Sequence, residues 1–172
     1  MPPALISRPR PNPATRRVWR IVAAHYGPHA FDGEGARRYG GRWNSIGTPM
    51  VYTSSSLSLA ALEYFVHLDP DLEPPDLVAC PAQLPEGLPI AAVRADAMPY
   101  DWRNRSRDAA SALRAAGDAW ITAGTSPALE VPSIVVPEET NVLLHPHHPD
   151  RAQIRRGSPR RFSFDPRMWK PA

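Results

Sequence analysis

The glycine-rich loop around Arg42 is the first stretch of this chain whose residue types suggest chemistry. Gly40 and Gly41 stand directly before Arg42 and Trp43, and glycine is favoured where a backbone takes a positive φ or comes close to another group. Arginine is a forked donor with a permanent charge, which suits phosphate. The ending of a Walker phosphate loop and the G-x-G-x-x-G dinucleotide pattern are both absent. The loop predicts a docking surface with Trp43 packed beneath it, although a lone arginine more commonly forms a surface ion pair.

Glu63 is the second candidate because of its place in an apolar run. Residues 57–68 are rich in Ala and Leu, follow three serines that can cap a helix, and end before a proline. At 100° per residue, Leu59, Leu62 and Val66 form an apolar stripe along this predicted helix. Glu63 lies about 40° from Leu59, on the rim of that stripe. Its carboxylate is therefore drawn toward the interior or a cleft, but a packed stem with the charged head in water fits the spacing equally well.

A histidine cluster and a serine triplet suggest two further chemistries. The cluster consists of His145, His147 and His148, followed by Asp150. Two prolines interrupt it, so no i, i+4 helical face can aim two imidazoles at one metal ion. We therefore expect a structured turn there and no metal site. The serines at 54–56 lack the G-x-S-x-G elbow of a serine hydrolase and are expected to cap the following helix.

The elements that must position these residues predict an α+β fold in a single compact domain. Strand composition recurs at residues 18–22, 50–53, 77–84, 90–95, 129–137 and 141–146, and helical composition at 57–68 and 105–121. This order has no βαβ rhythm, which predicts mixed short strands with a few helices. Residues 1–16 carry five prolines and are predicted to form a flexible arm without a regular element, so that residues 17–172 form the domain.

Composition narrows the function classes. No apolar stretch is long enough to span a bilayer, which predicts a cytoplasmic protein with no membrane association. Cys80 is the only cysteine, so it excludes an intrachain disulfide and a cysteine-based zinc site, and it is expected to be buried. The net charge is only +3, but arginines crowd the C-terminal segment. Since no nucleic-acid-binding motif accompanies them, we expect a solvated basic edge or a partner contact, and direct nucleic-acid binding is not expected.

Two long motifs carry a resemblance to a known family. GARRYGGRWNSIGTPMVYTSSSLSLAALEYFVH at residues 35–67 and VPSIVVPEETNVLLHPHHPD at residues 131–150 resemble the RES-domain family, the toxins of Xre–RES toxin–antitoxin pairs. The likeness extends over roughly residues 17–155. The Arg, Glu and Ser that give the family its name match Arg42, Glu63 and Ser133. The family usually has Asn in the place of His145, so a local role for that Asn does not transfer.

The resemblance implies a fold similar to the ADP-ribosyltransferase toxins and a cleft that binds NAD⁺ as substrate, with no metal. It implies catalytic roles for Glu63, Arg42 and Ser133, and it places Arg20 and Tyr52 near the cleft. Ser133 would either contact the substrate or orient Glu63, and Tyr52 would stack on nicotinamide. The implied partner is an Xre-type antitoxin with a DNA-binding domain, and a homodimer within that complex is left open.

The implied activity is toxicity through cleavage of NAD⁺ at the nicotinamide–ribose bond. The acceptor distinguishes three enzymes, because water gives an NAD⁺ glycohydrolase, phosphate a phosphorylase and a protein side chain an ADP-ribosyltransferase. We favour NAD⁺ degradation, with Arg20 or Arg37 as candidates to hold an acceptor phosphate. The alternative from another class is a non-catalytic module that binds a partner or nucleic acid through the glycine-rich loop and the basic segment.

Overall fold

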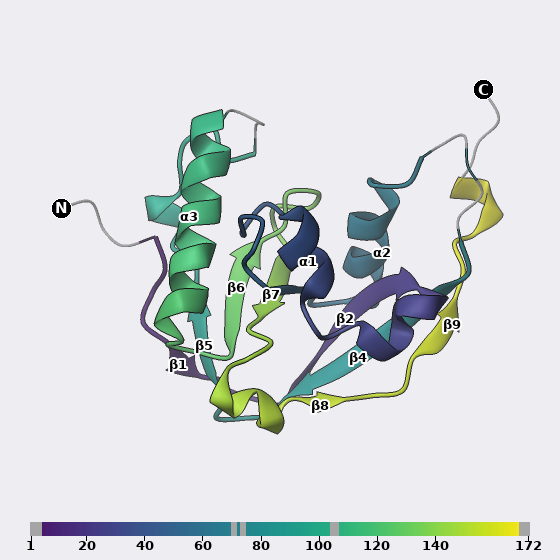
Figure 1. The fold of residues 1–172 in the computed structure, drawn as a ribbon, viewed down its shortest axis with the longest axis horizontal. Coiled ribbons are helices and arrows are strands. Elements are labelled where there is room, and N and C mark those ends of the chain that lie inside the picture. Colours follow the sequence, from purple (N-terminus) through teal and green to yellow (C-terminus); the bar gives the residue numbers. More distant parts are fainter. Residues whose placement is uncertain (1–4, 70–71, 73–74, 104–106, 169–172) are drawn as a thin grey trace.

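The computed structural model describes residues 5–69, 72, 75–103 and 107–168. Within these residues the strands form one sheet in the order β1-β5-β6-β7-β3-β2-β4-β8, with β9 also paired to β4 (Figure 1). The strands are β1 (Arg10–Pro11), β2 (Arg16–Ala23), β3 (Val51–Ser54), β4 (Leu77–Leu84), β5 (Pro89–Ala92), β6 (Ala128–Pro132), β7 (Thr140–Leu144), β8 (Arg155–Arg156) and β9 (Arg160–Phe162). The α-helices are α1 (Glu34–Tyr39), α2 (Leu57–Phe65) and α3 (Arg107–Ala123). Short 3-10 helices are Ala24–His29, Ala95–Ala97, Pro149–Gln153 and Pro166–Met168.

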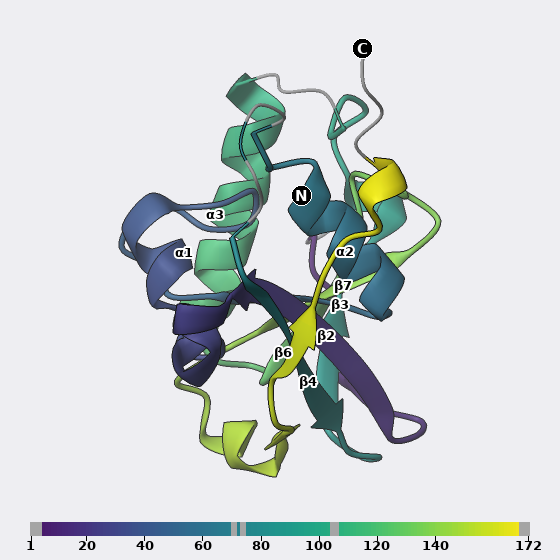
Figure 2. The same cartoon turned by 90° about the vertical axis from the view of Figure 1, so that its right-hand side faces the viewer.

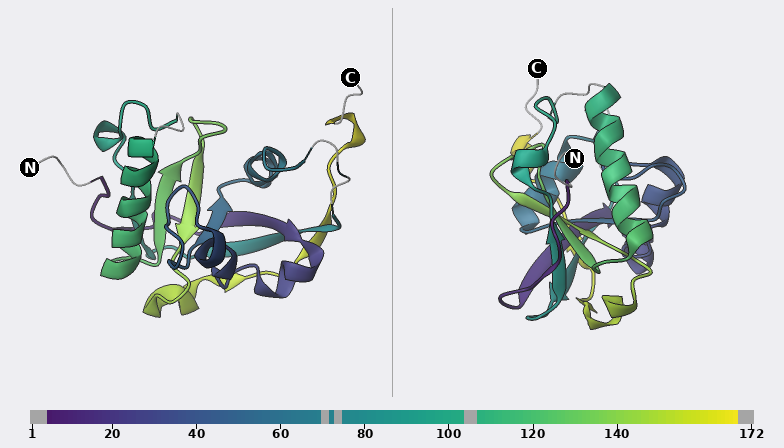
Figure 3. Two further views of the ribbon diagram at one scale, coloured as in Figure 1. Left: turned by 45° about the horizontal axis from the view of Figure 1, so that its top comes forward. Right: turned by 90° about the vertical axis from the view of Figure 1, so that its left-hand side faces the viewer.

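The sheet is antiparallel except at one place. β5 and β6 are parallel, and α3 lies between them in the chain as the crossover that a parallel pair requires. The sheet curls so strongly that side chains of β5, β6 and β7 pack against side chains of β2 and β4 in one apolar cluster. Figures 2 and 3 show this curl from the two sides. The predicted mixture of short strands and few helices describes this arrangement.

The two longer helices cover different parts of the curled sheet. α3 packs through Leu113 and Trp120 on Leu129 of β6 and Leu143 of β7. α2 packs on the β2 and β4 part of the sheet (Figure 1). In the view of Figure 1, α1 and the loop that joins it to β3 appear between α3 and α2.

The buried face of α2 differs from the predicted stripe. Ser56 caps the helix as expected, since its Oγ accepts a hydrogen bond of 3.0 Å from the Leu59 amide. Leu59 is buried, but Leu62 and Val66 are 37% and 54% exposed. The prediction for those two residues is wrong because the aromatic rings of Tyr64 and Phe65 pack on Phe164, which rotates the buried face away from Leu62.

α3 approaches the glycine-rich loop closely enough to require a glycine. Its buried face consists of Ala109, Leu113, Gly117 and Trp120. A Cβ at Gly117 would lie 1.8 Å from the backbone oxygen of Trp43. The helix therefore touches the loop backbone directly at Trp43. This contact helps to set where Arg42, the residue before Trp43, lies.

Parts of the N-terminal segment that the structure describes pair with the sheet. Ile6 pairs with Val93, and β1 pairs with β5. Asn12 is buried, with its side-chain amide donating to the backbone oxygens of Leu84 and Pro85. The prediction that residues 1–16 hold no regular element is therefore wrong for residues 5–16, because proline is compatible with an edge strand. Residues 1–4 lie outside the described part, and the division into an arm and a domain stays a prediction.

The basic C-terminal segment continues the sheet. β8 and β9 both pair with β4, and the arginines of these strands are exposed, as expected for a solvated basic edge. Cys80 is buried in the sheet, as predicted. None of the helices in the described ranges combines the length and the apolar character that a membrane-spanning helix needs.

Candidate active site

A cavity of about 820 Å³ lies between the glycine-rich loop, α2, α3 and the ends of β6 and β7. Small-molecule sites have volumes of about 300–1,000 Å³. A second cavity of about 460 Å³ adjoins it along β2 and α2. The residues that line both cavities are Arg20, Tyr52, Glu63, His67 and Asn141. The predicted site residues Arg20, Tyr52 and Glu63 thus lie at the junction of the two cavities, and Arg42 lines the larger one.

Glu63 is held through one of its two carboxylate oxygens. Its Oε1 accepts hydrogen bonds from Ser133 Oγ at 2.7 Å and from Asn141 Nδ2 at 2.5 Å. Among the described residues, none forms a hydrogen bond or ion pair with Oε2. The carboxylate is half-buried at the cavity junction, so Oε2 is the oxygen left for a bound molecule.

Ser133 is fully committed to contacts within the protein. Its buried Oγ accepts from the amides of Val135 at 3.1 Å and Val136 at 3.0 Å, and it donates to Glu63. A hydroxyl has one hydrogen and two lone pairs, so no capacity remains for a substrate. Of the two roles expected for Ser133, this geometry fits the orientation of Glu63. β6 ends directly before it at Pro132, which lacks an N–H.

Asn141 is a site residue that the sequence did not single out. It stands at the start of a predicted apolar strand, within the second long motif, but none of the residue matches taken from the resemblance fell on it. Its Oδ1 accepts a hydrogen bond from Ser54 Oγ at 2.7 Å, and its Nδ2 donates to Glu63. An ionised carboxylate only accepts hydrogen bonds, so the amide nitrogen must face Glu63. A polar amide at the head of an otherwise apolar strand is the signal that could have drawn attention to it.

Arg20 brings a half-buried positive charge to the junction. Its Nη1 donates to the backbone oxygen of Tyr52 at 2.9 Å, while its Nε is buried without a hydrogen-bond partner. Burial lowers the pKa of Arg20 below its ordinary value. Among the described residues, no carboxylate lies within ion-pair distance of it. A half-buried cation that has no carboxylate partner is suited to an anionic ligand, because the ligand would supply the opposite charge.

The glycine-rich loop carries Arg42 into the larger cavity. The Arg42 Nη1 donates to the backbone oxygen of Trp102 at 3.0 Å, which draws the side chain toward the residues that precede α3. A Cβ at Gly41 would lie 2.5 Å from Tyr52 Oη and 2.7 Å from Asn44 Oδ1. Gly41 is thus required by packing inside the protein, which is a different reason from the expected approach of a ligand. Trp43 is 2% exposed beneath the loop, as predicted.

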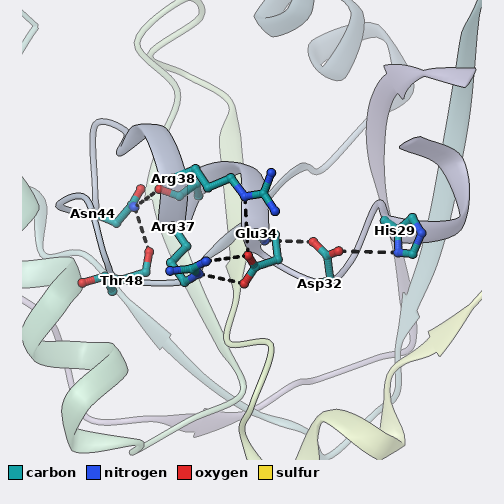
Figure 4. A network of polar contacts seen from close by, with 8 residues as sticks. His29, Asp32, Glu34, Arg37, Arg38, Asn44 and Thr48 are labelled. Atoms are coloured by element: carbon teal, nitrogen blue, oxygen red, sulfur yellow. Dashed lines mark hydrogen bonds and ion pairs between the residues drawn. The ribbon is translucent and has the colours of Figure 1, made fainter. Parts of the chain in front are cut away.

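Tyr52 holds this loop with its hydroxyl. Its Oη accepts from the Trp43 amide at 3.0 Å and donates to Asn44 Oδ1 at 2.7 Å. Burial raises the pKa of Tyr52 well above its ordinary value, so the hydroxyl keeps its proton. Asn44 in turn donates to the backbone oxygens of Ala36 and Thr48 (Figure 4). With the hydroxyl engaged, the ring is the part of Tyr52 that remains for contact with a ligand.

Arg37 does not belong to the site. Figure 4 shows it turned toward Glu34, which it contacts through two hydrogen bonds of 2.8 and 2.9 Å. It lines neither cavity. Of the two candidates for holding an acceptor phosphate, Arg37 is the less suited, because the glutamate one turn away in α1 already contacts its guanidinium.

The histidine cluster forms the expected turn. The ring of His145 contacts the backbone oxygen of Ile121 at 3.0 Å, and the ring of His148 contacts that of Gly124 at 3.1 Å. Their other ring nitrogens accept from the amides of His147 and Asp150. The turn thus connects β7 to the end of α3. Within the described residues, no group of three or more His, Cys, Asp or Glu side chains is arranged to hold a metal ion.

Comparison with known proteins identifies the family. The RES domain matches residues 17–165. The chain belongs to the RES-domain family. A relative from Sphingobium sp. (strain YBL2), named Prs ADP-ribosylating toxin, is 36% identical to this RES domain protein over 92% of this chain and 99% of its own length. A relative from Photorhabdus laumondii, named Toxin Res, is 36% identical over 75% of this chain and 81% of its own length.

A solved structure shares the fold of this RES domain. It is the M. tuberculosis MbcT–MbcA toxin–antitoxin complex, matched with a TM-score of 0.71 at 18% identity over 94% of this chain and 90% of that chain. The prediction of a compact α+β domain of the toxin type is therefore confirmed. The predicted residues Arg20, Arg42, Tyr52, Glu63 and Ser133 lie around the same two cavities or support a residue that lines them.

Proposed function

We propose that this RES domain is a toxin that binds NAD⁺ across the two cavities and breaks the bond between nicotinamide and ribose beside Glu63. One observation carries the proposal: a single carboxylate, fixed by Ser133 and Asn141, stands at the junction of the cavities with its Oε2 left for a ligand. Two arginines border the same space. Glu63 supplies a negative charge beside the reacting carbon, and the two arginines supply positive charges for a diphosphate.

A single carboxylate is sufficient for this bond. When the bond between the ribose anomeric carbon and the nicotinamide nitrogen breaks, the electron pair stays on the nitrogen and the cationic ring leaves as neutral nicotinamide. The leaving group therefore needs no proton, and no general acid is required. Positive charge grows on the ribose, and Glu63 Oε2 stabilises it there, whereas ordinary glycosidases use two carboxylates.

The residues present fit the substrate. Arg20 lines both cavities and forms no ion pair with a carboxylate of the described residues, so we assign it to a phosphate oxygen of NAD⁺. Arg42 borders the larger cavity and adds a second cation for the diphosphate. The ring of Tyr52 is available for stacking on nicotinamide, since its hydroxyl is engaged elsewhere. The proposal assigns no role to a metal.

The acceptor of ADP-ribose gives two candidate activities. Transfer to water or inorganic phosphate degrades NAD⁺. Transfer to a protein side chain would make the enzyme an ADP-ribosyltransferase, and the name of the Sphingobium relative favours this second candidate. Both activities share the same first step, the release of nicotinamide.

The biological role follows from the relatives. We propose that the chain acts in the cytoplasm and is neutralised by an antitoxin, because the solved complex pairs a toxin of this fold with its antitoxin. The Xre type of that antitoxin and its DNA-binding domain remain part of the proposal. Expression without the antitoxin is expected to arrest growth, and co-expression is expected to restore it.

The experiment is incubation of the purified chain with NAD⁺ labelled in its adenylate phosphate, with and without inorganic phosphate and with a bacterial protein extract. Chromatography follows nicotinamide and the labelled product, and gel electrophoresis follows label on protein. Free ADP-ribose or its phosphorylated product supports degradation, and label on a protein band supports transfer. If nicotinamide is not released under any condition, the enzyme proposal is wrong. A non-catalytic module, with strongly salt-dependent binding, would then replace it.

A further inference from the structure

Asn141 sits at a position that the sheet fixes from both sides. On β7 it pairs with Ser54 of β3 and with Val131 of β6. β7 is thus an interior strand, and its backbone is tied to two neighbours. Because directly paired residues of antiparallel strands direct their side chains to the same face, Ser54 stands next to Asn141. The Oγ–Oδ1 distance of 2.7 Å agrees with that register.

The hydrogen bonds from Ser54 to Glu63 run in one direction. Ser54 donates its only hydroxyl hydrogen to Asn141 Oδ1, which leaves the amide hydrogens of Asn141 directed toward Glu63. If the Asn141 amide turned over, its oxygen would face a carboxylate oxygen, and two acceptors would repel each other. Glu63 therefore selects the amide orientation that donates to it, and Ser54 stabilises that orientation by donating to Oδ1 of Asn141. Ser54 is 4% exposed, so water does not easily take its place.

Glu63 needs this second donor because it comes from a different element. Its backbone belongs to α2, and the terminal torsion of a glutamate side chain is broad. The bond from Ser133 alone would let the carboxylate rotate about that contact. Asn141 adds a second bond to the same oxygen from the neighbouring strand, so the two donors converge on Oε1 from the loop after β6 and from β7.

We propose that Asn141, oriented by Ser54, is a positioning residue that holds Glu63 with Oε2 turned toward the junction of the two cavities. This inference rests on the proposed NAD⁺ cleavage for its catalytic consequence. The relay, by which we mean the hydrogen bonds from Ser54 to Asn141 and from Asn141 to Glu63, is a separate statement about the folded protein. Asn141 acts through Glu63, and its loss removes the orientation of the carboxylate while leaving its charge in place.

The variant that tests the relay is Asn141→Asp, which keeps the shape of the side chain. At alkaline pH both carboxylates are ionised and repel each other, so Glu63 is displaced. At acidic pH the introduced carboxyl holds a proton, since two adjacent carboxylates share one. That O–H again donates to Glu63. We expect kcat to fall by about 10–100-fold at alkaline pH, a typical loss for a residue that orients a functional group, with little change in KM. The loss is expected to shrink as the pH falls.

The matched pair Ser54→Ala and Ser55→Ala provides the control. Ser55 is the next residue and its side chain is exposed. Ser54→Ala is expected to lower kcat by removing the bond that orients Asn141, and Ser55→Ala is expected to leave it unchanged. Circular dichroism establishes that each variant is folded. The relay is wrong if both Asn141→Asp and Ser54→Ala turn over as the original chain does. A loss with Asn141→Asp that is equal at every pH would instead mean a merely structural role and would also overturn it.

A readout that needs no activity separates this inference from the proposed function. The side-chain amide of Asn141 gives an NMR signal that disappears in Asn141→Asp and can be assigned in this way. We expect Glu63→Gln and Ser54→Ala to shift that signal, and Ser55→Ala to leave it in place. If the original chain releases no nicotinamide while the signal behaves as expected, the proposed function is wrong and the relay stands. If neither Glu63→Gln nor Ser54→Ala moves the signal, the relay is wrong whatever the enzyme activity.

Discussion

At the scale of single residues, most polar side-chain atoms of the site already form hydrogen bonds within the protein. Ser133 uses both lone pairs on backbone amides and its hydrogen on Glu63. Tyr52 uses its hydroxyl on the glycine-rich loop. The atoms left over are Oε2 of Glu63 and Nε of Arg20. A residue type that suggests catalysis, such as a serine, can therefore serve only to position the group that reacts.

Ser133→Ala is predicted to lower both stability and turnover. It leaves the half-buried amides of Val135 and Val136 without their acceptor and removes one donor to Glu63. We expect the free energy of unfolding in urea to fall by about 1–3 kcal/mol, the usual penalty for an unsatisfied buried group. Ser158→Ala, at an exposed position, is the control and is expected to be neutral. An unchanged unfolding curve for Ser133→Ala would contradict the assigned hydrogen bonds.

At the scale of elements, the contact between α3 and the glycine-rich loop positions Arg42. Gly117→Ala would place a methyl group against the Trp43 carbonyl, at a distance that no side chain tolerates without movement. We expect the free energy of unfolding to fall by about 3 kcal/mol or more, at the upper end of the usual cost of overpacking. We also expect lower turnover, because the loop that carries Arg42 is displaced. Gly35→Ala in α1 meets nothing within 4 Å and is expected to be neutral or slightly stabilising. Equal stability of the two variants in thermal unfolding would refute the close approach of α3.

The turn after β7 is predicted to make stability depend on pH. Burial, and secondarily the neighbouring His148 and His147, lower the pKa of His145 below its ordinary value of 6.5. The unfolded chain then binds a proton more readily than the folded one between the lowered value and 6.5. The contribution of neutral His145 to the free energy of unfolding is therefore fully present above pH 6.5. It is lost as the pH falls from 6.5 through the lowered pKa of the folded state. Urea unfolding at about pH 8 and about pH 5 measures this dependence.

Replacement of the histidine tests the assignment. His145→Asn, which installs the residue usual at that place in the family, is expected to flatten the dependence of stability on pH. His25→Asn, at an exposed site, is expected to leave it as it was. If His145→Asn and the original chain lose stability equally toward acid, the cause lies in another group.

At the scale of the whole molecule, the sequence predicted the elements better than their contacts. The strands β2 to β7 and the two long helices were predicted from local composition, because period-2 and period-3.6 patterns are local properties, whereas the short strands β1, β8 and β9 were not predicted. The exposed side of α2 was not predictable, since it depends on Phe164, about a hundred residues away in the chain. The pairing of residues 5–16 with β5 was hidden by prolines that an edge strand accepts.

The sequence named candidate site residues, but it did not predict the hydrogen bonds between them. Arg42, Glu63 and Ser133 were named through motif resemblance. The structure places Glu63 at the junction of the two cavities, Arg42 on the larger cavity and Ser133 in a hydrogen bond with Glu63. The bonds of Glu63 to Ser133 and Asn141 span 70 and 78 residues, and only the strand order β6-β7-β3 brings these side chains together. Arg37 is made the less suited candidate for an acceptor phosphate by an ion pair within α1 that its spacing from Glu34 could have predicted.

The sharpest test of NAD⁺ cleavage at Glu63 is the rate of nicotinamide release by Glu63→Gln, with Glu86→Gln as the matched control at an exposed glutamate. Gln keeps the shape of Glu63 and removes its charge. If that charge stabilises the developing cation, release by Glu63→Gln should fall by about 10²–10³-fold, and release by Glu86→Gln should be unchanged. A folded Glu63→Gln variant that releases nicotinamide at the original rate would contradict the role assigned to this carboxylate.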